Sequence, residues 1–376
     1  MPKMPNDALI GKFGRAGDLW GPALVLEKDT FFRNLHAMAE RCAAAGVALR
    51  PHAKTHKSAQ VAREQISAGA VGICCATANE AITLGRLGID NILLTTPVTE
   101  RQKISALVAL ASEITLGIVV DHASQLELWE RAIDDSGANL NVLIDVDIGM
   151  RRTGARGGDV VTLAKRTQQS RGMTYVGIQA YSGMVQHIEE FDSRETAYRA
   201  QLENLREIIE ILRVEGAAPR IVSGGGTGTM DLDLSMGLMT EVQFGSYVFM
   251  DVEYSNVKLL QKNENPFSPA LFVRSAVISA NAREHLTINA GFKSLSTDGP
   301  LPQIRDDSST RYEFFGDEYG RISGPKIENI KLGDHVDIVV PHCDPTVGLH
   351  DYFHLIDHDT LVDIWRIDAR GPLQIY

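Results

Sequence analysis

The chain has 376 residues, of which 44% are hydrophobic, so it is long enough for two domains or for one barrel with an additional module. Its 48 acidic residues outnumber 37 basic ones and give a net charge of -11, which argues against nucleic acid and anionic membranes as partners because both bind basic surfaces. No apolar run approaches the roughly 20 residues of a membrane span, residues 1–20 lack the apolar core of a signal peptide, and the four cysteines form no C-x-x-C pair. We therefore expect a cytoplasmic protein with reduced thiols.

Short apolar runs alternate with amphipathic helical segments between residues 48 and 250. Eight of these runs read as strands: 48–54, 72–77, 91–97, 115–121, 139–147, 174–182, 220–226 and 241–249. Strands that alternate with helices form parallel β-α units, and eight units in about 200 residues predict an α/β fold with a closed (β/α)₈ barrel of the TIM type. The alternative is an open doubly wound sheet, but such a sheet usually has fewer strands and one dominant glycine-rich first turn, which this chain lacks.

The remaining strand-like runs lie on either side of this region. The run at 22–29 is a ninth strand, which does not fit a barrel of eight. After Asp251 short strands are separated by turn residues without a long helix, which predicts an all-β domain. We therefore expect a barrel over residues 22–252, with the strand 22–29 free to pair elsewhere, and a C-terminal β-domain over residues 253–376.

The stretch R-P-H-A-K-T-H-K runs from Arg50 to Lys57 and places Lys54 at the end of the first predicted barrel strand. Active-site residues of such barrels lie at the carboxyl ends of the strands. We expect the neighbouring cations His52, His56 and Lys57 to lower the pKa of Lys54 by like-charge repulsion, with burial acting in the same direction, which leaves a neutral nucleophilic amine. A solvated basic patch is the alternative interpretation.

Polar residues also end other predicted strands. Asp145 and Asp147 end the fifth, Tyr181 ends the sixth with His187 close behind it, and Tyr247 lies in the eighth. The ends of parallel barrel strands meet at one rim, so these side chains are expected to converge with Lys54.

The seventh predicted strand ends in the glycine-rich turn S-G-G-G-T-G-T, from Ser223 to Thr229. It matches neither the P-loop nor the dinucleotide-binding fingerprint, and a plain tight turn is the alternative. Barrels commonly hold phosphate with the loops after strands seven and eight. A phosphate site opposite a lysine at a strand end indicates pyridoxal phosphate, which needs a lysine, a phosphate anchor and a partner for the ring nitrogen.

The predicted β-domain contains V-V-P-H-C-D-P-T-V, in which His342 and Asp344 are two residues apart. In an extended segment both side chains point to one face and Cys343 to the other. Imidazole with carboxylate suits Mn²⁺, Mg²⁺ or Zn²⁺. A polar turn before Pro345 is the alternative, and we interpret the nearby His350, His354 and His358 as surface or interface residues.

Six motifs together resemble one known group of enzymes: P-H-A-K-T-H-K, D-x-D-x-G-x-x-R-T-G, Q-A-Y-S-G-M-V-Q-H, S-G-G-G-T-G-T, G-S-Y-V-F-M-D and P-H-C-D-P-T. In this order they resemble the D-threonine aldolase and D-serine dehydratase group of the alanine-racemase-like fold, fold type III of the pyridoxal phosphate enzymes. The resemblance covers nearly the whole chain. It implies a barrel followed by a β-domain, with the strand 22–29 and the segment 1–21 associated with that β-domain. It also implies a homodimer whose active sites lie where the barrel of one chain meets the β-domain of the other.

The same resemblance implies a role for each matching residue. Lys54 is the Schiff-base lysine, Arg152 rather than Arg151 faces the ring nitrogen, and Tyr181 lies beside the cofactor. The phosphate is held by Gly225, Gly226, Thr227 and Tyr247, with Ser223 as a further cofactor-binding residue. His342 and Asp344 bind a divalent metal near the substrate.

The metal motif distinguishes the branches of this group. The dehydratase branch is similar in carrying a His-x-Cys motif, which implies zinc. This chain has His-x-Asp instead, which resembles the aldolase branch and implies manganese or magnesium. We therefore expect retro-aldol cleavage of a D-3-hydroxy amino acid to glycine and an aldehyde, with His187 or a metal-bound hydroxide as the base. The alternatives are a D-serine or D-threo-3-hydroxyaspartate dehydratase and a non-catalytic pyridoxal phosphate-binding protein. The sequence leaves open the accepted side chain, the metal and the preference at Cβ.

Overall fold

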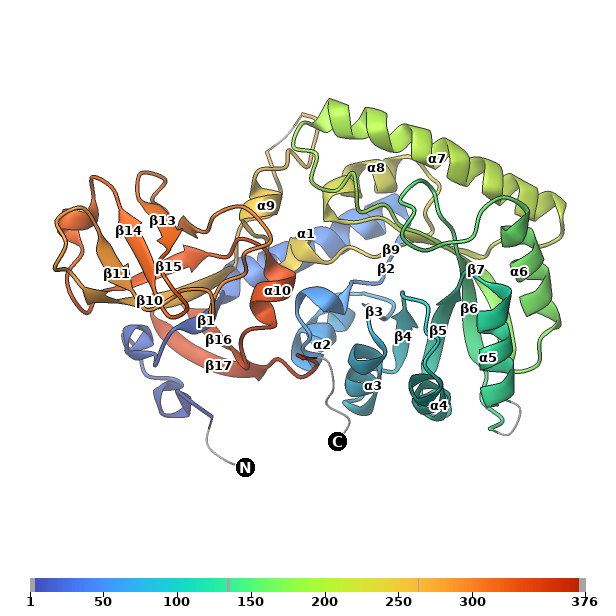
Figure 1. Ribbon diagram of the computed structural model, residues 1–376, viewed down its shortest axis with the longest axis horizontal. Coiled ribbons are helices and arrows are strands. Elements are labelled where there is room, and N and C mark those ends of the chain that lie inside the picture. Colours follow the sequence, from blue (N-terminus) through green and yellow to red (C-terminus); the bar gives the residue numbers. More distant parts are fainter. Residues whose placement is uncertain (1–3, 134–135, 263, 372–376) are drawn as a thin grey trace.

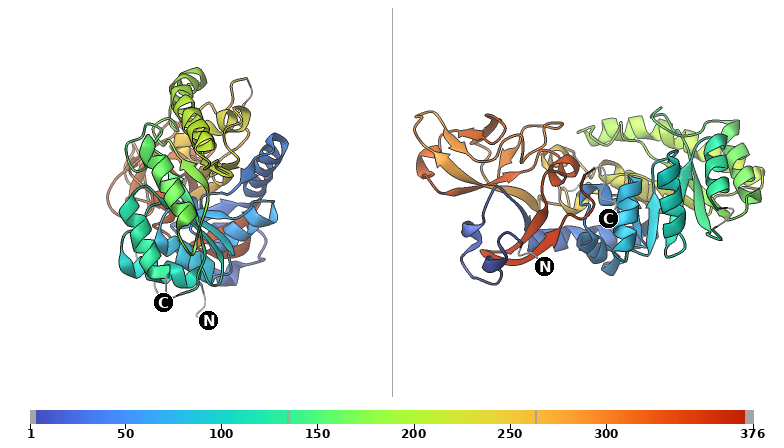
Figure 2. Two further views of the ribbon diagram at one scale, coloured as in Figure 1. Left: turned by 90° about the vertical axis from the view of Figure 1, so that its right-hand side faces the viewer. Right: turned by 60° about the horizontal axis from the view of Figure 1, so that its bottom comes forward.

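The computed structural model describes residues 4–133, 136–262 and 264–371. Two sheets lie side by side and give the molecule an elongated, two-lobed shape (Figure 1, Figure 2). One sheet has eight strands with helices on its outer side, and the other has nine. The prediction of an α/β barrel followed by a β-domain is thus confirmed.

The strands of the first sheet are all parallel and lie in the order β2-β9-β8-β7-β6-β5-β4-β3. An isolated parallel bridge between His52 and Cys74, with the Cys74 amide donating to the Pro51 carbonyl at 2.8 Å, joins the segment after β2 to β3 and so connects the two ends of the sheet. The strands are β2 (Ala48–Leu49), β3 (Ile73–Cys75), β4 (Asn91–Leu94), β5 (Thr115–Val120), β6 (Leu140–Asp145), β7 (Met173–Ala180), β8 (Ile221–Gly224) and β9 (Glu241–Val242).

Two of these strands are much shorter than the sequence predicts. The runs 48–54 and 241–249 each contribute only two residues to a strand, and their later parts form the 3₁₀ turns Ala53–Thr55 and Ser246–Val248. The apolar residues in these turns are buried at the rim of the barrel, so hydrophobicity alone does not distinguish them from strand residues.

The helices of the barrel follow from local signals in the sequence. The helix α1 begins after Glu27, whose carboxylate accepts from the Thr30 amide at 3.0 Å, and ends at Gly46 with φ 68°. The helix α3 has a capping box made by Thr77 and Glu80. The helices are α1 (Lys28–Ala45), α2 (Ala59–Ser67), α3 (Ala78–Arg86), α4 (Arg101–Leu110), α5 (Ala123–Ile133), α6 (Gly158–Gln169), α7 (Phe191–Val214) and α8 (Met230–Ser235).

The second sheet has the order β11-β14-β13-β12-β15-β10-β1-β16-β17. Its strands are β1 (Ala23–Glu27), β10 (Leu271–Ser279), β11 (Leu286–Ile288), β12 (Gln303–Ile304), β13 (Arg311–Phe314), β14 (Gly320–Ser323), β15 (His335–Val339), β16 (Tyr352–Asp357) and β17 (Thr360–Arg366). Strand β1 lies inside this sheet, antiparallel to β10 and parallel to β16. The segment before β1 packs on the same lobe, where the Gly11 amide donates to the Leu361 carbonyl at 2.8 Å.

The sequence pattern does not predict β16, and it misplaces one histidine. His354 is only 6% exposed, and its Nδ1 lies 3.1 Å from the Leu24 carbonyl oxygen of β1. The interpretation of His354 as a surface or interface residue is therefore wrong, because its ring is buried within the chain, where a backbone carbonyl satisfies it. His358, in contrast, is exposed.

Two short helices, α9 (Val252–Ser255) and α10 (Cys343–Val347), lie where the lobes meet (Figure 1). The Val252 amide donates to the Val340 carbonyl at 3.0 Å, and the Cys343 amide donates to the buried Asp251 carboxylate at 2.9 Å. These contacts fix the end of β15 at the rim of the barrel, so the predicted metal motif reaches the carboxyl ends of the barrel strands.

Candidate active site

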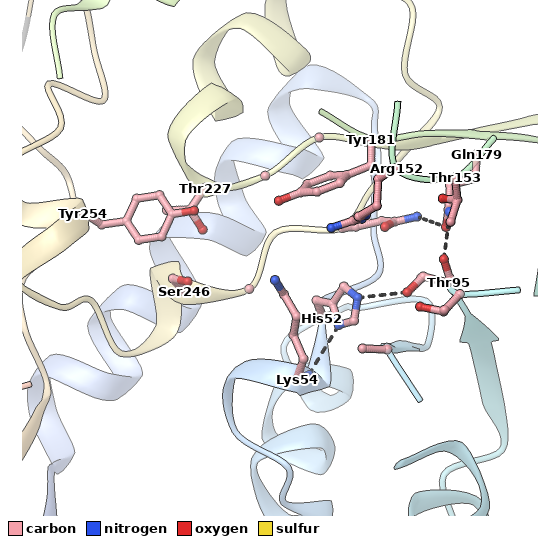
Figure 3. Close-up of a pocket in the computed structure, with 16 residues that line it drawn as sticks. His52, Lys54, Thr95, Arg152, Thr153, Gln179, Tyr181, Thr227, Ser246 and Tyr254 are labelled. Atoms are coloured by element: carbon pink, nitrogen blue, oxygen red, sulfur yellow. Dashed lines mark hydrogen bonds between the residues drawn. The ribbon is translucent and has the colours of Figure 1, made fainter. Parts of the chain in front are cut away.

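A cavity of about 420 Å³ opens at the carboxyl ends of the barrel strands (Figure 3). Its size and its mixture of apolar walls and convergent polar groups suit a small ligand. The lining residues are His52, Lys54, Ala76, Thr95, Thr96, Arg152, Thr153, Gln179, Tyr181, Gly225, Gly226, Thr227, Gln243, Gly245, Ser246 and Tyr254.

Lys54 extends its amine into this cavity (Figure 3). Its position is fixed from below, because the Lys54 amide donates to His52 Nδ1 at 3.3 Å and His52 Nε2 lies 3.1 Å from Thr95 Oγ1. The Lys54 Nζ lies 3.8 Å from Asp344 Oδ2. The carboxylate of a residue near the end of the chain therefore faces the amine of the lysine that follows the first barrel strand.

The expectation of a lowered pKa for Lys54 is wrong in this structure. The negative charge of Asp344 raises the pKa of Lys54 and outweighs the opposing effect of burial. Burial lowers the pKa of His52 well below its usual value and that of His56 to about 3, so both rings are neutral at pH 7 and do not repel the amine. Their positions in the sequence do not reveal this burial.

The glycine-rich turn forms one wall of the cavity. Gly225 has φ 74°, and a Cβ on it would lie 2.4 Å from Asp233 Oδ2. A Cβ on Gly226 would lie 2.4 Å from Gln186 Oε1. Glycine is therefore required at both positions, because a side chain would collide with Asp233 or Gln186. The backbone of the turn faces the cavity, where it can bind a ligand. A bulky residue at Gly226 would disturb Gln186 as well as any phosphate site.

Two of the predicted cofactor-binding side chains do not line the cavity. Ser223 is buried inside the barrel, where its hydroxyl donates to Glu241 Oε1 at 2.8 Å. The Tyr247 hydroxyl lies 3.3 Å from Gln65 Nε2, and the Tyr247 amide donates to Thr227 Oγ1 at 3.1 Å. Tyr247 therefore supports the glycine-rich turn from behind, and Ser246 beside it lines the cavity.

Arg152 and Tyr181 lie beside each other in the wall of the cavity (Figure 3). The Arg152 guanidinium is 5.6 Å from the centre of the Tyr181 ring, a cation–π distance. Arg151 lies in a separate hollow with Asp147 and Arg156. The structure therefore brings Arg152, and not Arg151, to the cavity that contains Lys54.

The predicted metal pair meets by a different route from the one its spacing indicates. His342 has extended backbone angles, but Cys343 starts α10, so the segment turns into a helix at this point. The side chains still converge, with His342 Nε2 3.3 Å from Asp344 Oδ2. Cys343 is buried, and its sulfur lies 3.5 Å from the Met250 carbonyl oxygen, away from the pair.

The electrostatics of this pair fit a divalent cation. Burial opposes ionisation of Asp344, but Lys54 and His342 lower the pKa of Asp344. Burial opposes protonation of His342, but Asp344 and Asp298 raise the pKa of His342 to about 9. Asp344 Oδ1 is buried without a hydrogen-bond partner among the described residues. An ionised carboxylate with an unused buried oxygen next to an imidazole nitrogen is a donor set that a hard cation would satisfy.

His187 lies beside the metal pair. Its Nδ1 is 3.2 Å from Glu253 Oε1, and its ring centre is 4.9 Å from that of Tyr254. Burial lowers the pKa of His187, so the ring is neutral at pH 7 and can accept a proton. The structure thus groups His187 with Lys54 and the metal pair, as the sequence predicts for strand-end residues.

Sequence reasoning missed several residues of this region, among them Ser246, Glu253, Tyr254 and Asp298. The first three lie within or next to the motif G-S-Y-V-F-M-D, so their position after the eighth barrel strand was a usable signal. Asp298 lies in a loop of the β-domain, and no motif marks it.

The residues present fit pyridoxal phosphate. The cavity combines a lysine amine, the backbone of a glycine-rich turn and an arginine in its wall, which are the parts that this cofactor requires. Lys54, Arg152 and Tyr181 would surround its ring, and Gly225, Gly226, Thr227 and Ser246 would hold its phosphate.

Comparison with known proteins agrees with this geometry. Residues 26–253 match the family model of the alanine racemase N-terminal domain, and residues 270–356 match that of a putative serine dehydratase domain. The chain belongs to the alanine-racemase-like family.

Of the helices that the structure describes, none combines the length and apolar character that crossing a bilayer requires.

Members of this family align over most of the chain. The 3-hydroxy-D-aspartate aldolase of Paracoccus denitrificans (strain Pd 1222) is 34% identical over 359 residues, which cover 93% of this chain and 92% of that protein. The D-threonine aldolase of Filomicrobium marinum has a crystal structure that superposes with a TM-score of 0.91 at 34% identity, covering 94% of this chain and 96% of that one. The D-threo-3-hydroxyaspartate dehydratase of Delftia sp. (strain HT23) is less similar, with 29% identity over 76% of this chain and 75% of its own. The predicted resemblance to the aldolase branch is confirmed.

Proposed function

We propose that the protein is a pyridoxal phosphate- and metal-dependent lyase that cleaves D-3-hydroxy amino acids to glycine and an aldehyde. The observation that carries this proposal is the distance of 3.8 Å between Lys54 Nζ and Asp344 Oδ2. Because Asp344 of the metal pair lies next to the amine of the cofactor lysine, an amino acid bound at the cofactor would present its 3-hydroxyl to the metal. Both kinds of aldolase relative support the same reaction.

The residues divide the work as follows. When bound, pyridoxal phosphate accepts the electrons of the broken Cα–Cβ bond, and a divalent metal lowers the pKa of the hydroxyl. His342 and Asp344 hold the metal, and Arg152 neutralises negative charge on the ring side of the cofactor. Neutral His187 takes the proton of the hydroxyl at Nε2, since its Nδ1 is turned to Glu253. Tyr254 covers this end of the cavity.

A dehydratase is less well supported by the same residues. In the His-x-Cys arrangement the metal-binding thiolate stands two residues after the histidine, where this chain has Asp344, and the Cys343 sulfur between them is buried, 3.5 Å from the Met250 carbonyl oxygen. Burial also raises the pKa of Cys343 well above its usual value, so the thiol is protonated. The carboxylate of Asp344 therefore favours Mn²⁺, with Mg²⁺ as the alternative.

The accepted side chain is best inferred from charge. Glu253 and Asp298 both lie near His342, at 4.0 Å and 2.9 Å from its Nδ1. Lys54 and Arg152, the cations of the cavity wall, are both assigned to the cofactor. An anionic side chain next to the metal would therefore be repelled, which favours substrates such as D-threonine or D-phenylserine over D-3-hydroxyaspartate.

We also infer that the protein is a homodimer in the cytoplasm. The alanine-racemase-like fold supports a dimer, and the four buried free thiols fit a reducing compartment. In this structure the metal pair and Lys54 belong to the same chain. A partner would add residues around the site rather than supply the metal pair.

Analysis of products tests the proposed function directly. Incubation with D-threonine should give glycine and acetaldehyde in equal amounts with little ammonia, and L-threonine should be inert. D-3-hydroxyaspartate should have a kcat/KM about tenfold lower, because Glu253 and Asp298 place negative charge near its side chain. Stoichiometric ammonia and 2-oxobutanoate without glycine would show a dehydratase instead.

Replacement of His187 tests its role as the base. His187→Ala is expected to lower kcat for D-threonine cleavage about 10²-fold, the usual scale for loss of a general base, while the affinities for cofactor and metal stay at parental values. His358→Ala, which changes an exposed histidine, is the matched control and should leave kcat unchanged. A kcat of the His187 variant within about threefold of the parent would mean that another group removes the proton.

A further inference from the structure

We propose that Asp298 is a positioning residue for the metal, which acts through His342. Its carboxylate accepts a hydrogen bond from His342 Nδ1 and so keeps Nε2, on the other side of the ring, as the nitrogen that binds the ion. This inference rests on the proposed metal site at His342 and Asp344 and adds the group that prepares it.

The geometry separates the two nitrogens of the His342 ring. Nδ1 lies 2.9 Å from Asp298 Oδ2, a normal hydrogen-bond distance, and Nε2 lies 3.3 Å from Asp344 Oδ2. The hydrogen bond to Asp298 favours the tautomer with its proton on Nδ1. A metal ion at Nε2 takes the place of the proton that Nε2 shares with Asp344, and Nε2 lies on the Asp344 side of the ring.

Glu253 is the other carboxylate near Nδ1, but it does not fill this role. Its Oε2 is 4.0 Å from His342 Nδ1, which is too long for a hydrogen bond, and its Oε1 is 3.2 Å from His187 Nδ1. Each of the two histidines thus has its own carboxylate partner, Glu253 for His187 and Asp298 for His342.

The loop that carries Asp298 is fastened to the metal motif. The Ser296 amide donates to Thr346 Oγ1 of α10 at 3.2 Å, and the Ser296 hydroxyl donates to the His342 carbonyl at 3.3 Å. Just after Asp298, a Cβ on Gly299 would lie 3.4 Å from the Pro341 carbonyl oxygen and 3.5 Å from His342 Cβ. The loop therefore runs directly against His342.

The expected effect follows from how such partners act on a ligating histidine. A carboxylate that accepts from the second ring nitrogen fixes the ring orientation and makes the ligating nitrogen more basic, and its loss typically lowers metal affinity 10–100-fold. Asp298 is 53% exposed on its side chain, so the lower part of that range is expected.

The test is the affinity of the full-length protein, loaded with pyridoxal phosphate, for Mn²⁺, measured by titration calorimetry. Asp298→Ala should weaken Mn²⁺ binding about 10-fold or more, whereas Asp298→Asn, whose amide oxygen still accepts from Nδ1, should recover part of that loss. Asp306→Asn removes the same charge from an exposed site of the β-domain and should bind Mn²⁺ as the parent does. The cofactor absorbance should be the same in all variants, which shows that the fold and the cofactor site are intact.

The outcomes separate this inference from the proposed function. If His342→Ala loses Mn²⁺ binding but Asp298→Ala keeps the parental affinity within about twofold, the positioning role is overturned and the metal site stands. Equal losses of Mn²⁺ affinity in Asp298→Ala and Asp306→Asn would mean that Asp298 acts only through its negative charge, which would also overturn the inference. If His342→Ala itself binds Mn²⁺ normally, the metal site and the inference both fail, whatever the reaction products are.

Discussion

Replacing Lys54 by alanine is expected to abolish cleavage of D-threonine, with kcat below about 10⁻³ of the parent, the scale seen when a residue that forms the covalent link is lost. The physical reason is the absence of a substitute amine. The Lys57 ammonium donates to the backbone carbonyls of Lys54 and Asp344, the latter at 2.9 Å, and so holds the two segments together instead of entering the cavity.

Chemical trapping of the cofactor provides the measurement. Borohydride treatment of the yellow holoenzyme should attach the cofactor irreversibly to the peptide that contains Lys54, and no attachment should occur in Lys54→Ala. Lys57→Ala is the matched control and should still be labelled at Lys54. Labelling at Lys57 in the parent protein, or a Lys54 variant with parental activity, would contradict the assignment.

Removal of the metal is the second change with a large expected effect. A chelator should lower kcat about 10²–10⁴-fold, since a Lewis acid at the reacting oxygen contributes several kcal/mol, and Mn²⁺ should restore it. The cofactor should stay bound throughout, because its anchors on the glycine-rich turn share no residue with the metal pair. Cofactor absorbance and activity, recorded on the same samples, separate the two effects.

Variants of the metal pair extend this experiment. His342→Ala and Asp344→Ala should each lose the rescue by Mn²⁺, whereas Cys343→Ala should retain it because its sulfur lies on the buried side of α10. An inactive Cys343→Ala protein together with an active Asp344→Ala protein would indicate a thiolate metal site of the dehydratase kind.

The parts of the site that could be predicted are those coded by neighbouring residues. Lys54 and the glycine-rich turn each follow an apolar run that forms a strand, and the rule that barrel strands end at one rim was enough to place them in one cavity. The spacing of His342 and Asp344 also predicts that the two side chains converge, and they do, although the segment bends into α10 and is not extended.

The parts that could not be predicted depend on segments that meet only in the folded protein. The pKa of Lys54 was assigned from its neighbours in the sequence, but the charge that dominates it belongs to Asp344, almost 300 residues later. Asp298 is one of 48 acidic residues and occupies a loop without a motif. Its contact with His342 arises because the Ser296 hydrogen bonds bring that loop against α10.

The position of β1 in the middle of the nine-stranded sheet has a consequence for how the chain folds. β1 is among the first segments to be synthesised, but its neighbours β10 and β16 begin at Leu271 and Tyr352. Such distant pairings make folding slow, and until they form, both edges of β1 are open to pairing with other chains. The strands of the barrel are synthesised after β1 and before β10, so the barrel can form before β1 pairs and can keep β1 near its later partners. A ribosome-bound fragment that ends before β10 therefore lacks both strands that pair with β1, although it already contains every strand of the barrel.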